Sequence, residues 1–142
     1  TQSRSSAASD VYKRQGEYQG HAGPAHTFTP MQVWDVRLNQ GSISELPVPE
    51  GWNAAIIVLR GTVSVNGDAI ARDAQMVLLD RAGSGVTIEA NNDAVVLLIS
   101  GEPIDEAIVG HGPFVMNSHE EIVQAIDDFN SRRFAQIPAR AG

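Results

Sequence analysis

The sequence predicts an all-β protein that ends in one α-helix. Between residues 31 and 99 it contains about seven or eight short apolar or alternating runs, and turn-forming residues separate them at roughly ten-residue spacing. Asn66-Gly67 lies between two such runs and indicates a tight β-hairpin. After residue 117 the apolar spacing becomes that of an amphipathic helix. These patterns predict a sandwich or barrel of antiparallel strands, followed by a helix.

The first predicted strand is Met31–Leu38, because its residues alternate between two faces. Asn39-Gln40-Gly41 ends it. Ser42–Gly51 predicts a short strand that stops at its prolines, since proline cannot donate to a central ladder. Ala54–Leu59 is a continuous apolar run, which is typical of a buried strand.

A hairpin and three further strands follow. Asn66-Gly67 supplies two residues that readily adopt positive φ, as a type I′ turn requires. Glycine, aspartate or asparagine bounds each of the last three runs. The predicted strands of this part are Thr62–Val65, Asp68–Ala71, Gln75–Leu79, Val86–Ala90 and Ala94–Ile99.

The predicted helix begins after Ser118. Ser118 and Glu121 have the spacing of a capping box, in which each side chain accepts a hydrogen bond from a free backbone donor. Two acidic residues in the first turn, Glu120 and Glu121, are expected to complement the helix dipole. Arg132 and Arg133 are expected to do the same in the last turn. One apolar stripe is expected to pack against the barrel or a further lobe, and it consists of Ile122, Ala125, Ile126 and Phe129.

The bulk properties exclude several classes of function. A chain of 142 residues is long enough for one compact domain with its own core and too short for two ordinary ones. Its formal net charge is −7, and residues 1–15 carry three basic and one acidic side chain, so the remainder has a net charge of −9. Such a body repels phosphate groups, which argues against nucleic-acid and anionic-membrane partners. No apolar run approaches the roughly 18 residues of a membrane span, and no secretory signal is visible, so a cytoplasmic protein is expected.

Residues 1–15 differ in composition from the rest of the chain. They are rich in serine, lack apolar periodicity and contain the only lysine. This segment is interpreted as a disordered terminus or as a non-native stretch, because RSSAASDVYKRQ resembles a translated sequencing artefact. In the second case the upstream coding sequence is missing. Residues 16–30 are rich in glycine and proline and are expected to form a linker.

Three segments resemble one known family. EGWNAAIIVLRGTVSVNGD resembles the core of a cupin fold, and TPMQVWDVRL upstream and HGPFVMNSHEEI downstream resemble the C-terminal cupin lobe of pirin-like proteins. The resemblance covers approximately Pro24 to Phe134, and it implies a cupin domain over residues 31–137. The implied fold is a cupin-type antiparallel β-barrel or jelly roll with one C-terminal α-helix.

The resemblance also implies a function for the whole protein. Pirin-like proteins are bicupins, implicated in quercetin 2,3-dioxygenation and, in eukaryotes, in transcriptional co-regulation. Their metal is held by three histidines and a glutamate of the N-terminal lobe. That lobe would bind a divalent metal such as iron, whereas none of those ligands can be carried over to this chain.

The residues themselves give the same result for metal binding. A metal-binding cupin needs His-x-His and a glutamate on one strand and a further histidine on a later strand. The corresponding segments here are residues 48–54 and the surroundings of Val86, where only Glu50 is chemically suitable. There is also no cysteine for a disulfide, a thiolate ligand or a nucleophile. No catalytic, cofactor-binding or metal-ligating residue is therefore predicted.

Two residues are candidates for a pocket or an interface. Trp52 is expected at the barrel mouth, as a core aromatic, as an aromatic of the interface between lobes or as the wall of a pocket. His111 lies between Gly110 and Gly112, where a tight turn is expected. It either donates a hydrogen bond to a backbone carbonyl and fixes this corner, or contributes to ligand binding.

The other histidines are interpreted as solvated. His21 and His26 lie in the linker, where a flexible chelator is the alternative, and His119 is the first residue of the helix.

Two functions of different classes follow. In the first, the chain is the non-metal C-terminal lobe of a quercetinase-like bicupin, inactive alone and packed against the N-terminal cupin lobe of the same protein. In the second, it is a non-catalytic binding or regulatory module for a small molecule or a protein. A lobe without its partner exposes apolar surface, so homodimerisation or poor solubility of the isolated chain is expected.

Overall fold

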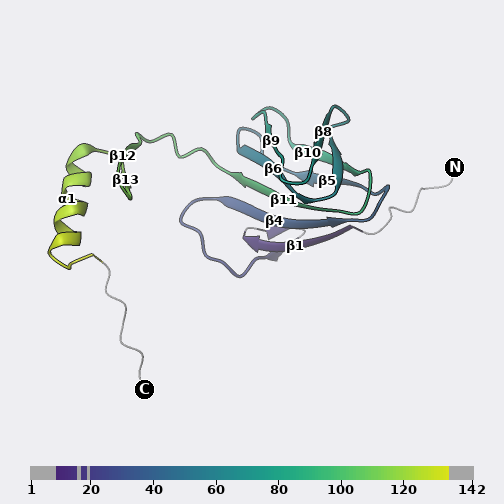
Figure 1. Cartoon of the computed structure of the whole chain (residues 1–142). Helices are drawn as coiled ribbons and strands as arrows, with labels where there is room; N and C mark the ends of the chain where they lie inside the picture. The colour runs from purple at the N-terminus through teal and green to yellow at the C-terminus, as the bar shows by residue number, and fades with distance from the viewer. Residues whose placement is uncertain (1–8, 16, 19, 135–142) are drawn as a thin grey trace, which may run out of the picture. The chain divides into compact units, whose positions relative to one another are not determined.

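The computed structural model describes residues 9–15, 17–18 and 20–134, with side chains described from residue 20 onward. Two compact units divide the chain, residues 1–103 and residues 104–142, and each is described by itself. The first unit contains two large antiparallel sheets (Figure 1) and one short two-stranded pairing. The second contains a small hairpin and the helix.

The larger sheet has five strands and is built around a long central strand. In spatial order it consists of β1 (Ser9–Gln15), β4 (Met31–Leu38), β11 (Ala94–Gly101), β6 (Asn53–Arg60) and β9 (Met76–Leu79). The smaller sheet has four strands, in the order β5 (Ile43–Pro47), β10 (Gly85–Ala90), β7 (Thr62–Val65) and β8 (Ala69–Arg72). All strand pairs are antiparallel. This is a jelly-roll-like arrangement, and it confirms the predicted all-β class.

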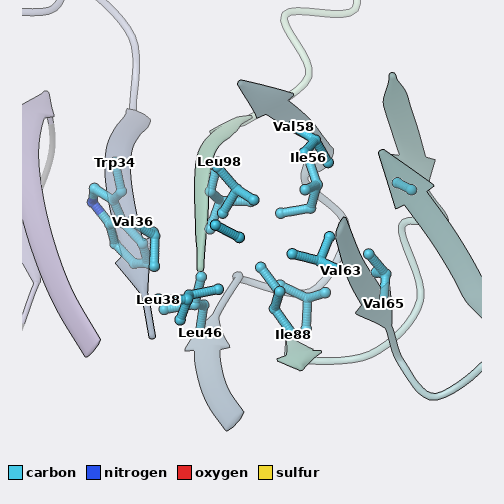
Figure 2. Close-up of a cluster of buried hydrophobic side chains, with 14 of the residues drawn as sticks. Trp34, Val36, Leu38, Leu46, Ile56, Val58, Val63, Val65, Ile88 and Leu98 are labelled. Atoms are coloured by element: carbon cyan, nitrogen blue, oxygen red, sulfur yellow. The ribbon is translucent and has the colours of Figure 1, made fainter. Parts of the chain in front are cut away.

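The core lies between the two sheets. Every second residue of the central strands points inward, and Figure 2 shows these side chains meeting in one apolar layer. Burial of each such side chain contributes roughly 1.5–3 kcal/mol. The fully buried members include Trp34, Val36, Leu46, Ile56, Val58, Val63, Val65, Ile88, Val96 and Leu98.

The Asn66-Gly67 hairpin is confirmed, with a loop one residue longer than expected. Asn66 and Gly67 have φ values of 53° and 70°, and the N–H of Asp68 donates to the carbonyl of Val65 over 3.1 Å. Val65 pairs with Ala69, so Asp68 belongs to the loop. Asn66 also accepts the N–H of Thr87 at its Oδ1 over 2.9 Å, which ties the turn to β10.

The N-terminal part differs from the expectation of an unstructured segment. Residues 9–15 form β1 and pair with β4, from Ser9 opposite Leu38 to Gln15 opposite Val33. Backbone donors and acceptors are present in any sequence, so a polar segment can complete the edge of a sheet. Residues 1–8 lie outside the described residues, and a non-native origin of residues 1–15 stays a prediction. The expected linker contains one short pairing, β2 (Glu17–Tyr18) with β3 (His21–Ala22).

The second unit contains a hairpin that the sequence analysis expected only as a turn. β12 (Val109–His111) and β13 (Phe114–Met116) pair directly, and Gly112 between them has a φ of 55°. Helix α1 (His119–Asn130) follows and packs on this hairpin. Its capping box is confirmed, because Ser118 Oγ accepts the N–H of Glu121 and Glu121 Oε2 accepts the N–H of Ser118.

One expectation for the helix is wrong, and a second is not tested. Arg132 and Arg133 follow the end of α1 at Asn130, so neither lies in its last turn. The chain leaves the helix there because Arg132 adopts a φ of 56°, the left-handed conformation of a helix C-terminus. Within its own unit the apolar stripe is only partly covered, because Ile122 and Ala125 are buried and Phe129 is 62% exposed. Its packing against the barrel or a further lobe stays a prediction.

Candidate functional site

The interior of the sandwich holds the positions where a cupin metal site would be expected. Val48 and Val86 occupy two of these positions, and both belong to the buried apolar core. Glu50, the one suitable donor of the sequence analysis, lies exposed in the turn after β5. The interior therefore supplies apolar contacts at the points where imidazole and carboxylate ligands would have to converge.

The acidic and histidine side chains of the described residues do not converge elsewhere. No group of three or more histidine, cysteine, aspartate or glutamate side chains with metal-binding geometry occurs among them. His21, His26 and His119 are exposed, as expected. The residues that the structure describes thus do not fit the divalent metal that the family resemblance implies.

The buried hydroxyl groups of Ser42 and Ser100 form hydrogen bonds within the fold. The Oγ of Ser42 donates to the carbonyl of Asn39 over 2.7 Å, which closes the turn before β5. The Oγ of Ser100 lies 3.2 Å from Oε1 of Gln32 on the neighbouring strand. A serine nucleophile needs a base within hydrogen-bonding distance, and the partner of each hydroxyl here is a carbonyl oxygen. Both serines are explained as structural residues.

Trp52 lies in the turn between β5 and β6. Its side chain is half-buried against the core, and its backbone N–H donates to the carbonyl of Pro49 over 3.2 Å. Arg81 fixes the same turn, because its carbonyl accepts the N–H of Gly51 and its Nε donates to Oδ1 of Asn53, each over 2.8 Å. Trp52 therefore adds to the core from this turn, and its predicted role in a pocket stays a prediction.

A depression with a cavity volume of about 440 Å³ lies along β5 and β10 of the smaller sheet. It follows the pairing of β5 with β10, where Glu45 lies opposite Thr87. Trp52 does not contribute to its wall. Its lining consists of Glu45, Leu46, Pro47, Ser84, Gly85, Val86 and Thr87. One exposed carboxylate beside hydroxyl groups provides no acid–base pair and no metal shell.

His111 lies at the end of β12 and is exposed. Its side chain forms no hydrogen bond with another residue in the part of the chain that the structure describes. The corner is held instead by Asn117, whose Nδ2 donates to the carbonyl of Ala107 over 2.8 Å. The ring of Phe114 also packs edge-on against Phe129 and Phe134, with centroids 6.2 and 5.7 Å away. The predicted bracing role of His111 therefore has no contact to support it.

Comparison with known proteins gives the family. The model of the pirin C-terminal cupin domain matches residues 33–135. This chain belongs to the pirin family. A candidate quercetin 2,3-dioxygenase of Pseudomonas aeruginosa is 54% identical over 119 residues, and rat pirin is 35% identical over 122 residues. The matches cover 84% and 83% of this chain but 41% and 42% of those proteins.

A solved relative confirms the cupin fold of this pirin-family chain. Quercetin 2,3-dioxygenase from Acinetobacter baumannii superposes with a TM-score of 0.83 and 40% sequence identity. The superposition covers 91% of this chain and 45% of that protein. The chain thus spans less than half the length of the relatives that it matches, and it corresponds to their C-terminal cupin domain.

The larger sheet of this pirin-family domain has a second apolar surface that the sequence analysis did not single out. We call it the outer apolar face, and it consists of Ala55 and Ile57 on β6, Met76 and Leu78 on β9, and Leu97 and Ile99 on β11. A signal was present in the sequence, because the runs Ala54–Leu59 and Ala94–Ile99 are apolar throughout. Runs of this kind are typical of strands that are covered on both faces.

No helix among the described residues is long and apolar enough to cross a membrane.

Proposed function

We propose that this chain is the structural, non-metal cupin lobe of a pirin-like protein whose intact form is a metal-dependent quercetin 2,3-dioxygenase, and that the chain alone is inactive. The observation that carries the proposal is the interior of the sandwich. Val48 and Val86 are buried apolar side chains, and they occupy two positions where a metal site would need donor atoms. The relatives named for quercetin 2,3-dioxygenation support the assignment of the whole protein.

The different roles proposed for the two lobes follow from the chemistry of metal ligands. A divalent metal such as iron is held by imidazole and carboxylate groups that converge on one point. A packed apolar interior offers it no donor and resists the burial of charge. In this proposal the metal and the bound substrate belong to the N-terminal lobe, the part of the relatives that this chain does not match. The present lobe stabilises that lobe and limits access to it.

The test is to measure metal content and flavonol consumption of the purified chain after incubation with Fe²⁺. We expect less than stoichiometric metal and no loss of quercetin above the protein-free rate. The full-length Pseudomonas aeruginosa relative, treated identically, is the reference for both measurements. One bound metal ion per chain together with turnover of quercetin would contradict the proposal.

Thermal unfolding with and without a chelator tests the same proposal independently of activity. A resident metal present at 100 times its dissociation constant stabilises a fold by about 2.7 kcal/mol, and its removal lowers Tm. We expect the same Tm for this chain in EDTA and in added Fe²⁺, measured by circular dichroism. A Tm that falls in EDTA and recovers with Fe²⁺ would show that the chain holds a metal.

A further inference from the structure

The two sheets of the first unit differ in the chemistry of their outer surfaces. Antiparallel sheets commonly pack one face on the core and expose the other, which is then polar. The smaller sheet follows this rule, since its outward residues include Glu45, Ser64 and Glu89. On the larger sheet the polar outward residues Asp35 and Arg37 pair with each other on β4, whereas the six residues of the outer apolar face on β6, β9 and β11 carry no polar side chain.

The outer apolar face is continuous across three strands. The strand register aligns it in two rows, Ile99 with Ala55 and Leu78, and Leu97 with Ile57 and Met76. Met76 and Leu78 are 59% and 72% exposed, and the other four are half-buried. Contiguous apolar surface of this kind marks a binding surface more often than single exposed residues do.

We propose that the outer apolar face of the five-stranded sheet binds the N-terminal cupin lobe of a pirin-like protein. The inference rests on the proposed function, and it identifies the surface through which this lobe supports the other. The relatives provide the occupant, because this chain covers only 41–45% of their length. A second lobe in the same polypeptide is present at an effective concentration of about millimolar, which favours it over a separate copy of this chain.

The absence of cysteine from this sequence makes the surface accessible to a direct test. Leu78→Cys places a unique thiol on the outer apolar face, and Ile70→Cys places one on the other sheet. The two positions are matched: Leu78 and Ile70 are 72% and 62% exposed, and each lies on a four-residue strand at the end of its sheet. Both thiols should be alkylated readily in the isolated chain at low salt and at a protein concentration low enough to keep it dissociated, since reactivity follows exposure.

The experiment compares each variant alone and joined behind the N-terminal part of the Pseudomonas aeruginosa relative. Alkylation is followed by mass spectrometry of the peptide that contains position 78 or 70. We expect alkylation at position 78 to be roughly tenfold or more slower in the joined protein, because a covered thiol is reached only through local opening. The rate at position 70 should stay unchanged. If the joined protein does not unfold cooperatively, the same two positions are tested in the full-length relative.

Three outcomes would overturn the proposal. Equal rates at position 78 with and without the N-terminal lobe would mean that the lobe does not cover this face. Equal slowing at positions 78 and 70 would indicate a general effect. Protection that appears only with rising protein concentration would identify a second copy as the occupant. None of these outcomes depends on metal or turnover, so the docking surface and the proposed function can fail separately.

Discussion

At the scale of single residues, Gly61 shows how closely the strands approach at one corner of the first unit. A Cβ at this position would lie 2.5 Å from the carbonyl oxygen of Asp93 and 2.9 Å from the Cα of Ala94. Gly67 has a similar backbone conformation, with a φ of 70° against 89°, but a Cβ there would meet nothing within 4 Å. The two glycines therefore separate the effect of crowding from the effect of a positive φ.

We expect Gly61→Ala to lower the free energy of unfolding by about 1–3 kcal/mol more than Gly67→Ala, since crowding in a packed region costs this much. Urea denaturation of the two variants and the parent chain measures the difference. Equal losses would show that the strand after Asp93 shifts at no cost to accommodate the methyl group.

Trp52 and His111 show how much of the surroundings of a single residue could be predicted from the sequence. Trp52 was expected to lie near the core or a pocket, and it packs against the core because its turn is fixed by Arg81. The hydrogen bond expected for His111 depends on the path of neighbouring backbone. A pattern of glycines predicts that a turn exists but gives no information on which carbonyl comes within reach.

At the scale of elements, the helix cap is the feature with the clearest energetic consequence. Ser118 Oγ accepts the N–H of Glu121 over 3.2 Å, and Glu121 Oε2 accepts backbone N–H groups of Asn117 and Ser118. We expect Ser118→Ala to destabilise α1 by about 1 kcal/mol, the usual cost of a lost N-cap. Hydrogen exchange of the amides in residues 120–126 reports this change locally.

Ser131→Ala is the matched control, because Ser131 contributes only its backbone N–H to the helix C-terminus, through the carbonyls of Asp127 and Phe129. Its exchange rates should stay close to those of the parent chain. Equal acceleration in both variants would mean that the capping box does not determine the stability of this helix.

The strands and the helix also show which sequence patterns were sufficient to predict an element and its bounds. β4 was predicted to the residue, because eight alternating positions specify the strand and divide its residues between two faces. β12 and β13 were missed because three-residue strands beside glycine and proline carry no readable period. The end of α1 was misplaced because Arg132 adopts the left-handed conformation without being a glycine. Arg133 then pairs with Asp127 and Asp128 from beyond the helix.

At the scale of the whole molecule, two opposing forces act between copies of the isolated chain. The outer apolar face favours association, since burial of Met76 and Leu78 removes apolar surface from water. The net charge of −7 opposes it, because like-charged molecules repel one another. The repulsion is screened over about 8 Å at 0.15 M salt, whereas apolar burial is not weakened by salt.

We therefore expect the isolated chain to self-associate reversibly, and to do so more strongly as NaCl rises from low to physiological concentration. Sedimentation velocity over a range of protein concentrations measures this association. Leu78→Asp should weaken it at every salt concentration, because a carboxylate would lose its hydration in the apolar contact. Ile70→Asp adds the same charge on the other sheet and therefore controls for net charge. A chain that stays monomeric throughout, or equal weakening by both variants, would show that the outer apolar face does not drive association.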